Sequence, residues 1–221
     1  MIRLVDRRTA GRQLAAHLRE YAGRADVTVL ALPRGGVPVG FEIAGALGAP
    51  LDVIVVRKLG VPMYPEVAMG AIAGEKAIFL NRSVLRELHI DRASFDRVLA
   101  DEREELRRRE VAYRGTRPAL QLAGRTIILV DDGLATGATM QAAILALEEQ
   151  HVAAIVVAAP VASREAVAAI SEAGHSVVVL DTPEPFDGVS RWYEDFAPTG
   201  DEEVIELLDA AGNAGFSRRQ Q

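Results

Sequence analysis

The chain has 221 residues, of which 49 % are hydrophobic and 25 % charged, and its formal net charge is −6. This length suits one domain with a sizeable core, and the acidic balance gives no reason to expect a nucleic-acid partner. No cysteine is present, which excludes disulfides, thiolate nucleophiles and cysteine metal sites. The first residues lack the apolar core of a signal peptide, and the longest apolar run, 152–162, is too short for a bilayer. We therefore expect a cytoplasmic protein that does not bind membranes.

Apolar residues recur at helical and strand spacings, and they predict the following elements in chain order. They are a helix over 9–21, a strand over 27–32, a helix over 37–47, a strand over 51–56, an irregular stretch over 57–80 that ends in a short strand at 77–80, a helix over 91–113, a strand over 126–130, a helix over 139–150, a strand over 154–158, a helix over 163–173 capped by Ser163, a strand over 177–180 and a helix over 201–211. Residues 212–221 are predicted to form a flexible tail. The alternation predicts an α/β protein with a central parallel sheet of about five strands flanked by helices. Ligands of such sheets bind beyond the carboxyl ends of the strands.

The most informative segment runs from Ile127 to Thr139 and reads IILVDDGLATGAT. A strand ends in the acids Asp131 and Asp132, a loop of small residues follows, and a helix begins. Free backbone N–H groups and the positive end of the helix dipole favour an anion in such a loop. Adjacent carboxylates can accept hydrogen bonds from vicinal hydroxyls, so a sugar phosphate would suit both halves of the segment. The alternative is a Rossmann-like turn whose acids serve solubility alone.

This segment closely resembles the signature with which type I phosphoribosyltransferases bind phosphoribosyl pyrophosphate (PRPP), and it is most similar to the adenine-type version. The resemblance implies that the following residues bind PRPP: Asp131, Asp132, Ala135, Thr136, Gly137, Ala138 and Thr139. The chain departs from the family pattern at Ala138, where glycine is usual, and the added methyl group narrows the phosphate loop.

Two further segments resemble the same family. Arg34, Gly35 and Gly36 stand between the first strand and its helix, where the family has its pyrophosphate loop, and they look like the loop of xanthine–guanine-type enzymes. Arg57 and Lys58 follow the second strand, where the family has a mobile loop that closes over PRPP and brings basic residues to the pyrophosphate. The resemblance therefore implies a catalytic role for both. The simpler alternatives are an ordinary glycine turn and a general preference for arginine in this chain.

The resemblance covers about residues 25–182. It implies a single domain over 1–211, with a small hood formed by the N-terminal helix and residues 183–211. It also implies transfer of the 5-phosphoribosyl group of PRPP to a nitrogen acceptor, such as a nucleobase, with release of pyrophosphate. Mg²⁺ would arrive with PRPP, near Asp131 and Asp132, so no separate metal site on the protein is expected. Members of the family are often homodimers.

The acceptor is less clearly specified. The family's 6-oxopurine enzymes place a lysine after the fourth strand, and none occurs in residues 158–162, which argues against guanine and hypoxanthine. Those enzymes carry an aspartate in the PRPP loop, where this chain has Ala135. The adenine-type enzymes instead use a glutamate of the mobile loop, and the resemblance transfers that acid–base role to Glu66, whose alternative role is that of a solvated loop residue.

Other functions also fit the sequence. A PRPP-sensing regulator of the same fold would need a partner surface, and no basic stripe or DNA-binding domain is visible. A PRPP-dependent hydrolase, or a transferase for an unusual amine, also remains open. The aromatic residues Phe186, Trp192 and Tyr193 either stack on a flat base or pack within the hood. The four histidines show no metal-ligand spacing and are expected to be structural: His17, His89, His151 and His175.

Overall fold

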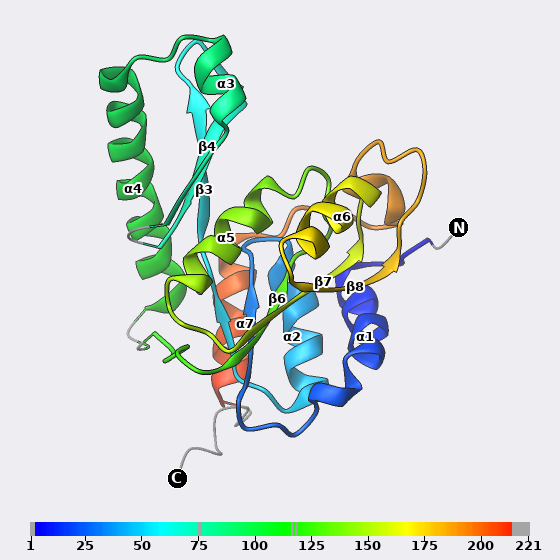
Figure 1. Ribbon diagram of the computed structural model, residues 1–221. Helices are drawn as coiled ribbons and strands as arrows, with labels where there is room; N and C mark the ends of the chain where they lie inside the picture. The colour runs from blue at the N-terminus through cyan, green and yellow to red at the C-terminus, as the bar shows by residue number, and fades with distance from the viewer. Residues whose placement is uncertain (1–2, 75–76, 116, 118, 214–221) are drawn as a thin grey trace.

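The computed structural model describes residues 3–74, 77–115, 117 and 119–213. Its centre is a parallel sheet of five strands in the order β2-β1-β6-β7-β8 (Figure 1). The strands are β1 (Val27–Ala31), β2 (Leu51–Val53), β6 (Thr126–Val130), β7 (Ala154–Val161) and β8 (Ser176–Asp181). Every residue of β1 and β6 is buried, as expected for a parallel sheet that is covered on both faces. The predicted five-stranded parallel sheet is confirmed.

Helices cover both faces of this sheet. Alternate side chains of β6 pack against the helices on opposite faces. Ile128 and Val130 pack in one cluster with the helices α1 (Arg7–His17) and α2 (Gly36–Leu47). Ile127 and Leu129 point to the opposite face and pack with α5 (Ala138–Glu148) and α6 (Arg164–Glu172). Successive side chains of a strand point to opposite faces, so a continuous apolar strand can anchor two helical layers. A short 3₁₀ helix, η1 (Arg19–Tyr21), follows α1.

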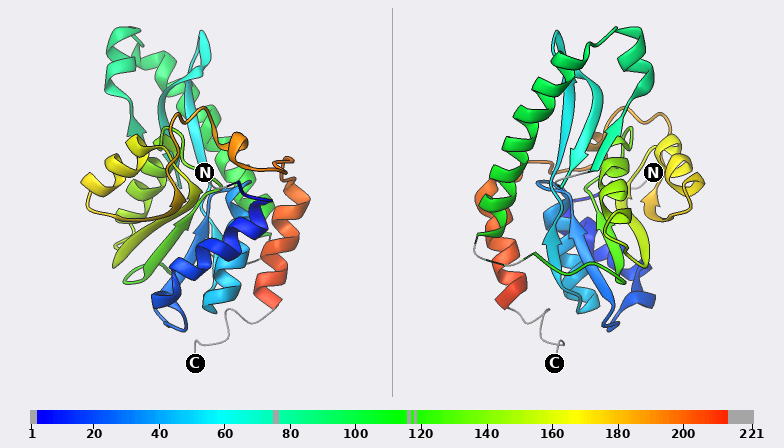
Figure 2. Two further views of the ribbon diagram at one scale, coloured as in Figure 1. Left: turned by 90° about the vertical axis from the view of Figure 1, so that its right-hand side faces the viewer. Right: turned by 60° about the vertical axis from the view of Figure 1, so that its left-hand side comes forward.

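Residues 56–114 form a separate arm that projects from the central sheet (Figures 1 and 2). The arm contains an antiparallel sheet in the order β3-β4-β5 together with two helices. These elements are β3 (Val56–Val61), β4 (Tyr64–Ala73), β5 (Ala77–Leu80), α3 (Arg82–Glu87) and α4 (Arg92–Arg114). Leu59 and Met69 of the hairpin pack with Leu99 and Leu106 of α4, so the arm has an apolar core.

The arm corrects two predictions. Residues 57–80 were predicted to be irregular apart from 77–80, but most of them form the strands β3 and β4. The strand predicted over 51–56 is split, because β2 ends at Val53 and Val56 already belongs to β3. The pairing of β3 with β4 shifts in register at Gly60, where a side chain would come 2.7 Å from the carbonyl oxygen of Pro65. The glycine therefore permits a close approach of two strands, not a turn.

After β8 the chain passes the carboxyl end of β6, where Tyr193 bonds to Asp132, and continues into a helix. The 3₁₀ helix η2 (Val189–Trp192) is followed by α7 (Asp201–Asn213). Residues 4–5 run beside residues 192–195, joined by three backbone hydrogen bonds such as Leu4 N–H to the carbonyl oxygen of Trp192 at 2.8 Å. Helix α7 includes Gly212 and Asn213, which were predicted to be part of the tail, while 214–221 lie outside the described residues.

The N-terminal helix, predicted to join the hood, lies against the central sheet beside α2, so residues near both ends of the chain meet at the sheet's carboxyl end. Whether 183–211 close over a ligand stays a prediction. Within the described residues, no helix has the length and apolar character needed to cross a membrane.

Candidate functional site

Two adjacent carboxylates stand at the carboxyl end of β6, the middle strand of the sheet. The backbone N–H of Asp132 donates to Oδ1 of Asp131 at 2.9 Å. Burial raises the pKa of Asp131 well above its usual range, and the neighbouring charge of Asp132 raises it further. Burial also raises the pKa of Asp132, opposed by a hydrogen bond from Arg7. The pair therefore favours hydrogen-bond donors and cations as ligands.

The loop after the acids is held to the neighbouring strand. The Ser163 hydroxyl donates to the carbonyl oxygen of Ala135 at 2.6 Å, and the Ser163 N–H donates to the carbonyl oxygen of Leu134 at 2.8 Å. The same hydroxyl accepts from Ala166 N–H, which confirms Ser163 as the cap of α6. Gly137 has a left-handed backbone, with φ 72°, immediately before α5 begins at Ala138. The loop thus connects the acid pair to the amino end of α5, where the helix dipole favours negative charge.

The predicted pyrophosphate loop lies directly against the acid pair. A Cβ atom on Gly36 would come 2.7 Å from the carbonyl oxygen of Val130 and 3.0 Å from Cα of Asp131. A Cβ atom on Gly35 would overlap the Asp132 carboxylate. Both glycines are therefore required by the close approach of the two loops. Arg34 lies farther out, half exposed, with Nη1 3.8 Å from Oδ1 of Asp201 at the start of α7.

The two basic residues of β3 diverge because successive strand residues point to opposite sides. Arg57 Nε donates to Oε2 of Glu102 on α4 at 2.6 Å. Lys58 is exposed, and its positive charge opposes the rise in the pKa of Asp131. The structure thus pairs Arg57 with Glu102 and leaves Lys58 exposed. Glu66 belongs to β4, but its side chain lies outside the described part of the chain.

Sequence reasoning missed a group that contacts the acids from both ends of the chain. Arg7 Nε donates to Oδ2 of Asp132 at 2.8 Å, and the Tyr193 hydroxyl donates to the carbonyl oxygen of Asp132 at 2.7 Å. The Asp6 side chain caps α1 by accepting from Thr9 N–H, which places Arg7 in the first turn. That capping pattern could have located Arg7 at a helix start, but nothing in the sequence indicates its partner.

The aromatic residues of the C-terminal segment pack against the protein. Trp192 and Tyr193 are 9 % and 4 % exposed and share a cluster with Leu4, Ala10 and Val161. The rings of Phe186 and Trp192 are stacked, with centroids 6.5 Å apart. The structure therefore shows Trp192 and Tyr193 packed against the N-terminal residues and the end of β7.

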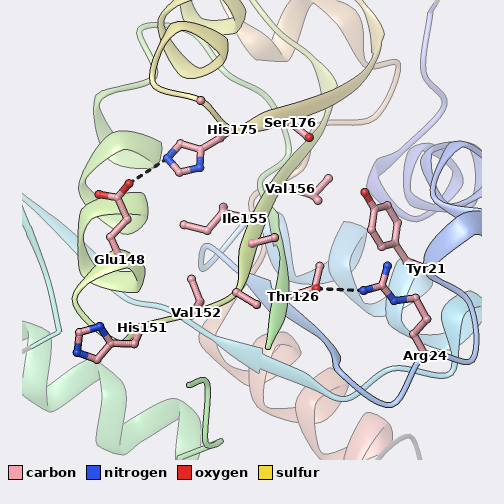
Figure 3. A pocket seen from close by; sticks show the side chains of 13 residues that line it. Tyr21, Arg24, Thr126, Glu148, His151, Val152, Ile155, Val156, His175 and Ser176 are labelled. Atoms are coloured by element: carbon pink, nitrogen blue, oxygen red, sulfur yellow. Dashed lines mark hydrogen bonds and ion pairs between the residues drawn. The ribbon is translucent and has the colours of Figure 1, made fainter. Parts of the chain in front are cut away.

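Two histidines line a hollow of about 850 Å³ at the amino ends of β6, β7 and β8, opposite the end that carries the acid pair (Figure 3). His175 Nε2 lies 3.2 Å from Oε1 of Glu148, while Tyr21 and Arg24 lie on the other side of the strands. The hollow therefore runs across the amino ends of these strands and is lined by side chains from both faces of the sheet.

The protein is thus an α/β protein in which two apposed loops lie at the carboxyl ends of the strands of a parallel sheet, where proteins of this class bind their ligands. Residues 6–184 match the family model described as the phosphoribosyl transferase domain, and the chain belongs to this family, with the fold of the type I phosphoribosyltransferases.

Several known proteins are similar to this chain. It is 46 % identical over 206 residues to proteins of two Mycobacterium tuberculosis strains, CDC 1551 and H37Rv, whose naming as phosphoribosyl transferases is itself provisional. The match covers 93 % of this chain and 46 % of theirs, so the chain spans about half the length of these curated relatives. The crystal structure of TT1426 from Thermus thermophilus superposes with a TM-score of 0.79 at 44 % identity, covering 94 % of this chain and 98 % of that one. A Neisseria gonorrhoeae protein with bound ppGpp shares the fold, with a TM-score of 0.54 at 15 % identity and coverage of 95 % and 96 %.

Proposed function

We propose that the protein transfers the 5-phosphoribosyl group of PRPP to a nitrogen acceptor, with a nucleobase as the leading class, and releases pyrophosphate. The observation that carries this proposal is the contact between two loops far apart in sequence. Gly35 and Gly36 pack against Asp131 and Asp132, and the loop that follows the acids leads into the amino end of α5. One ligand that spans these features needs a phosphate, a vicinal diol and a second phosphate group, and PRPP has all three.

Each part of the site has a distinct role in this proposal. The acids accept hydrogen bonds from the ribose hydroxyls, and the backbone of 135–139 binds the 5-phosphate. The loop 34–36 holds the pyrophosphate. Negative charge grows on that group as its bond to ribose breaks, so Lys58 stabilises the transition state more than the bound ground state.

We further propose which metal ion, partners and acceptor take part in the reaction. PRPP carries Mg²⁺, which prefers phosphate oxygens and water to a cage of protein ligands and neutralises phosphate charge. We also propose that this protein is cytoplasmic, acts without nucleic acid and can form a homodimer. The acceptor is proposed to be other than guanine or hypoxanthine, because residues 158–162, at the end of β7, contain no lysine.

A release assay tests the transferase proposal directly. The protein, PRPP and Mg²⁺ are incubated with a panel of nucleobases and amines, pyrophosphate is measured, and the product is identified by mass spectrometry. Acceptor-dependent release with a ribosylated product is expected. PRPP binding without release for any acceptor would instead favour a PRPP-sensing regulator, and release without any acceptor but water would indicate a hydrolase.

Lys58→Ala is expected to lower turnover by about 10- to 100-fold, because a hydrogen bond to a charged group contributes roughly 1.5–3 kcal/mol. PRPP affinity should fall much less, because the lysine acts mainly as the leaving group gains charge. Steady-state rates and calorimetric PRPP affinity separate the two effects.

Arg57→Ala is the matched comparison, since Arg57 is adjacent on β3 but bonded to Glu102. A catalytic role for Arg57 requires that bond to open during the reaction. Equal turnover of Lys58→Ala and wild type would remove Lys58 from the mechanism.

Glu66 is proposed to assist proton transfer at the acceptor nitrogen. General acid–base help is typically worth about 10²–10⁴-fold, so Glu66→Gln should lower turnover by that factor with little change in PRPP affinity. Rates are measured with the acceptor found in the panel. Turnover within about twofold of wild type would leave positioning and pyrophosphate stabilisation as the mechanism.

A further inference from the structure

The Arg7 guanidinium is held on three sides. Its Nε donates to Asp132, and its Nη1 donates to the carbonyl oxygen of Ala197 at 2.8 Å. Its Cζ lies 3.8 Å from the centroid of the Phe196 ring, a cation–π contact. The Arg7 and Asp132 side chains are only 11 % and 15 % exposed. The guanidinium is therefore fixed by α1, by the end of β6 and by the C-terminal segment together.

These contacts decide which carboxylate oxygens remain available. Asp131 uses Oδ1 to accept from the N–H of Asp132, and Asp132 uses Oδ2 to accept from Arg7. Within the described residues, no other residue donates a hydrogen bond to Oδ2 of Asp131 or to Oδ1 of Asp132. One free oxygen on each of two adjacent acids matches the two hydroxyls of a vicinal diol.

Gly35 makes room for this arrangement. A Cβ atom there would displace the Asp132 carboxylate and would also come 3.2 Å from Nε of Arg7. A glycine at this position of the pyrophosphate loop is therefore needed for the Arg7–Asp132 ion pair to form. It also leaves room for a phosphate to approach the backbone.

From these contacts we propose that Arg7 is a positioning residue for PRPP: it holds one oxygen of Asp132 so that the other faces the ribose hydroxyls. The inference rests on the proposed function, because it assigns the two free oxygens to ribose. Arg7 also ties the residues 196–197 to the acid pair, so binding of the ribose and the position of the C-terminal segment are linked. The proposal assigns Arg7 no contact with the reacting atoms.

A double-mutant cycle tests this proposal, with the affinity for PRPP and Mg²⁺ measured by calorimetry. Arg7→Gln is expected to weaken binding at least tenfold, because the carboxylate loses the donor that orients it. Asp132→Asn should also weaken binding, and the double variant should bind no more than about threefold more weakly than Asp132→Asn alone. A merely structural role for Arg7 would give additive losses.

Arg8→Gln is the matched control. Arg8 is the next residue of α1, and its Nε bonds to Oε1 of Glu42 at 2.7 Å on the exposed side of the helix. The PRPP affinity of the Arg8→Gln variant should stay within about twofold of wild type. Thermal unfolding of each variant shows whether it is folded at the assay temperature.

Arg7→Lys covers the case in which Arg7→Gln does not fold. An ammonium keeps the charge but cannot reproduce the guanidinium fork that joins Asp132 to Ala197, so at least threefold weaker PRPP binding is expected. Unchanged or tighter binding by Arg7→Gln or Arg7→Lys, or additive losses in the cycle, would overturn the inference while leaving the proposed function intact. Failure of the wild-type protein to bind PRPP would overturn both.

Discussion

Gly137→Val is expected to abolish detectable PRPP binding while the protein stays folded. Gly137 has φ 72° at the start of α5, a conformation that costs an L-residue roughly 1–2 kcal/mol and a β-branched residue more. A Cβ atom there would meet Ala166 at an ordinary contact distance of 3.4 Å, so the core need not be disrupted. The backbone would leave the left-handed region, and the N–H groups of the loop would no longer converge on the 5-phosphate. Calorimetry with PRPP and Mg²⁺ measures the loss.

Gly124→Val provides a control with matched backbone strain. Gly124 also has φ 72° but stands in the turn before β6, away from the carboxyl edge, and no atom outside its chain neighbours lies within 4 Å of its ideal Cβ position. The melting temperatures of the two variants should fall by similar amounts, and only Gly137→Val should lose PRPP binding. Normal PRPP binding by a folded Gly137→Val variant would contradict the loop assignment.

The double variant Asp131→Ala, Asp132→Ala is expected to bind PRPP at least tenfold more weakly. Each hydrogen bond from a ribose hydroxyl to a carboxylate contributes roughly 1.5–3 kcal/mol, and the variant leaves the diol without acceptors. The change is read from calorimetric affinity at neutral pH. Wild-type affinity in this variant would show that the ribose does not bind at the end of β6.

The Asp131 carboxylate by itself is not expected to stabilise the folded state. Burial raises the pKa of Asp131, so the folded state retains a proton that the unfolded state releases at its ordinary pKa. Wild-type stability therefore falls as pH rises from the ordinary to the raised pKa, and the deficit persists at neutral pH. Asp131→Asn removes this cost.

We therefore expect Asp131→Asn to melt at a higher temperature than wild type at neutral pH. The difference should shrink as pH falls toward the ordinary carboxyl range, where wild-type Asp131 is protonated in both states. Thermal unfolding at the two pH values measures this. A lower melting temperature for Asp131→Asn at neutral pH would mean that the carboxylate stabilises the fold.

The sequence by itself determined the elements whose signal is local. The strand Thr126–Val130 was predicted with its observed bounds, because a continuous apolar run between polar turns has few alternatives. Ser163 was predicted as a helix cap for a similarly local reason, since its hydroxyl serves a backbone group three residues away. The position of the acid pair at the carboxyl edge followed directly from the strand that precedes it.

The tertiary structure decided which distant groups meet. Glycine and proline in 57–80 suggested an irregular loop, but pairing between β3 and β4 and packing against α4 supply the contacts that make this segment a sheet. Arg57 and Lys58 were indistinguishable in sequence, and only the tertiary structure shows that Arg57 is bonded to Glu102 while Lys58 is exposed. The Arg7–Asp132 pair spans 125 residues, and no local pattern encodes such a contact because it depends on how the helices pack on the sheet.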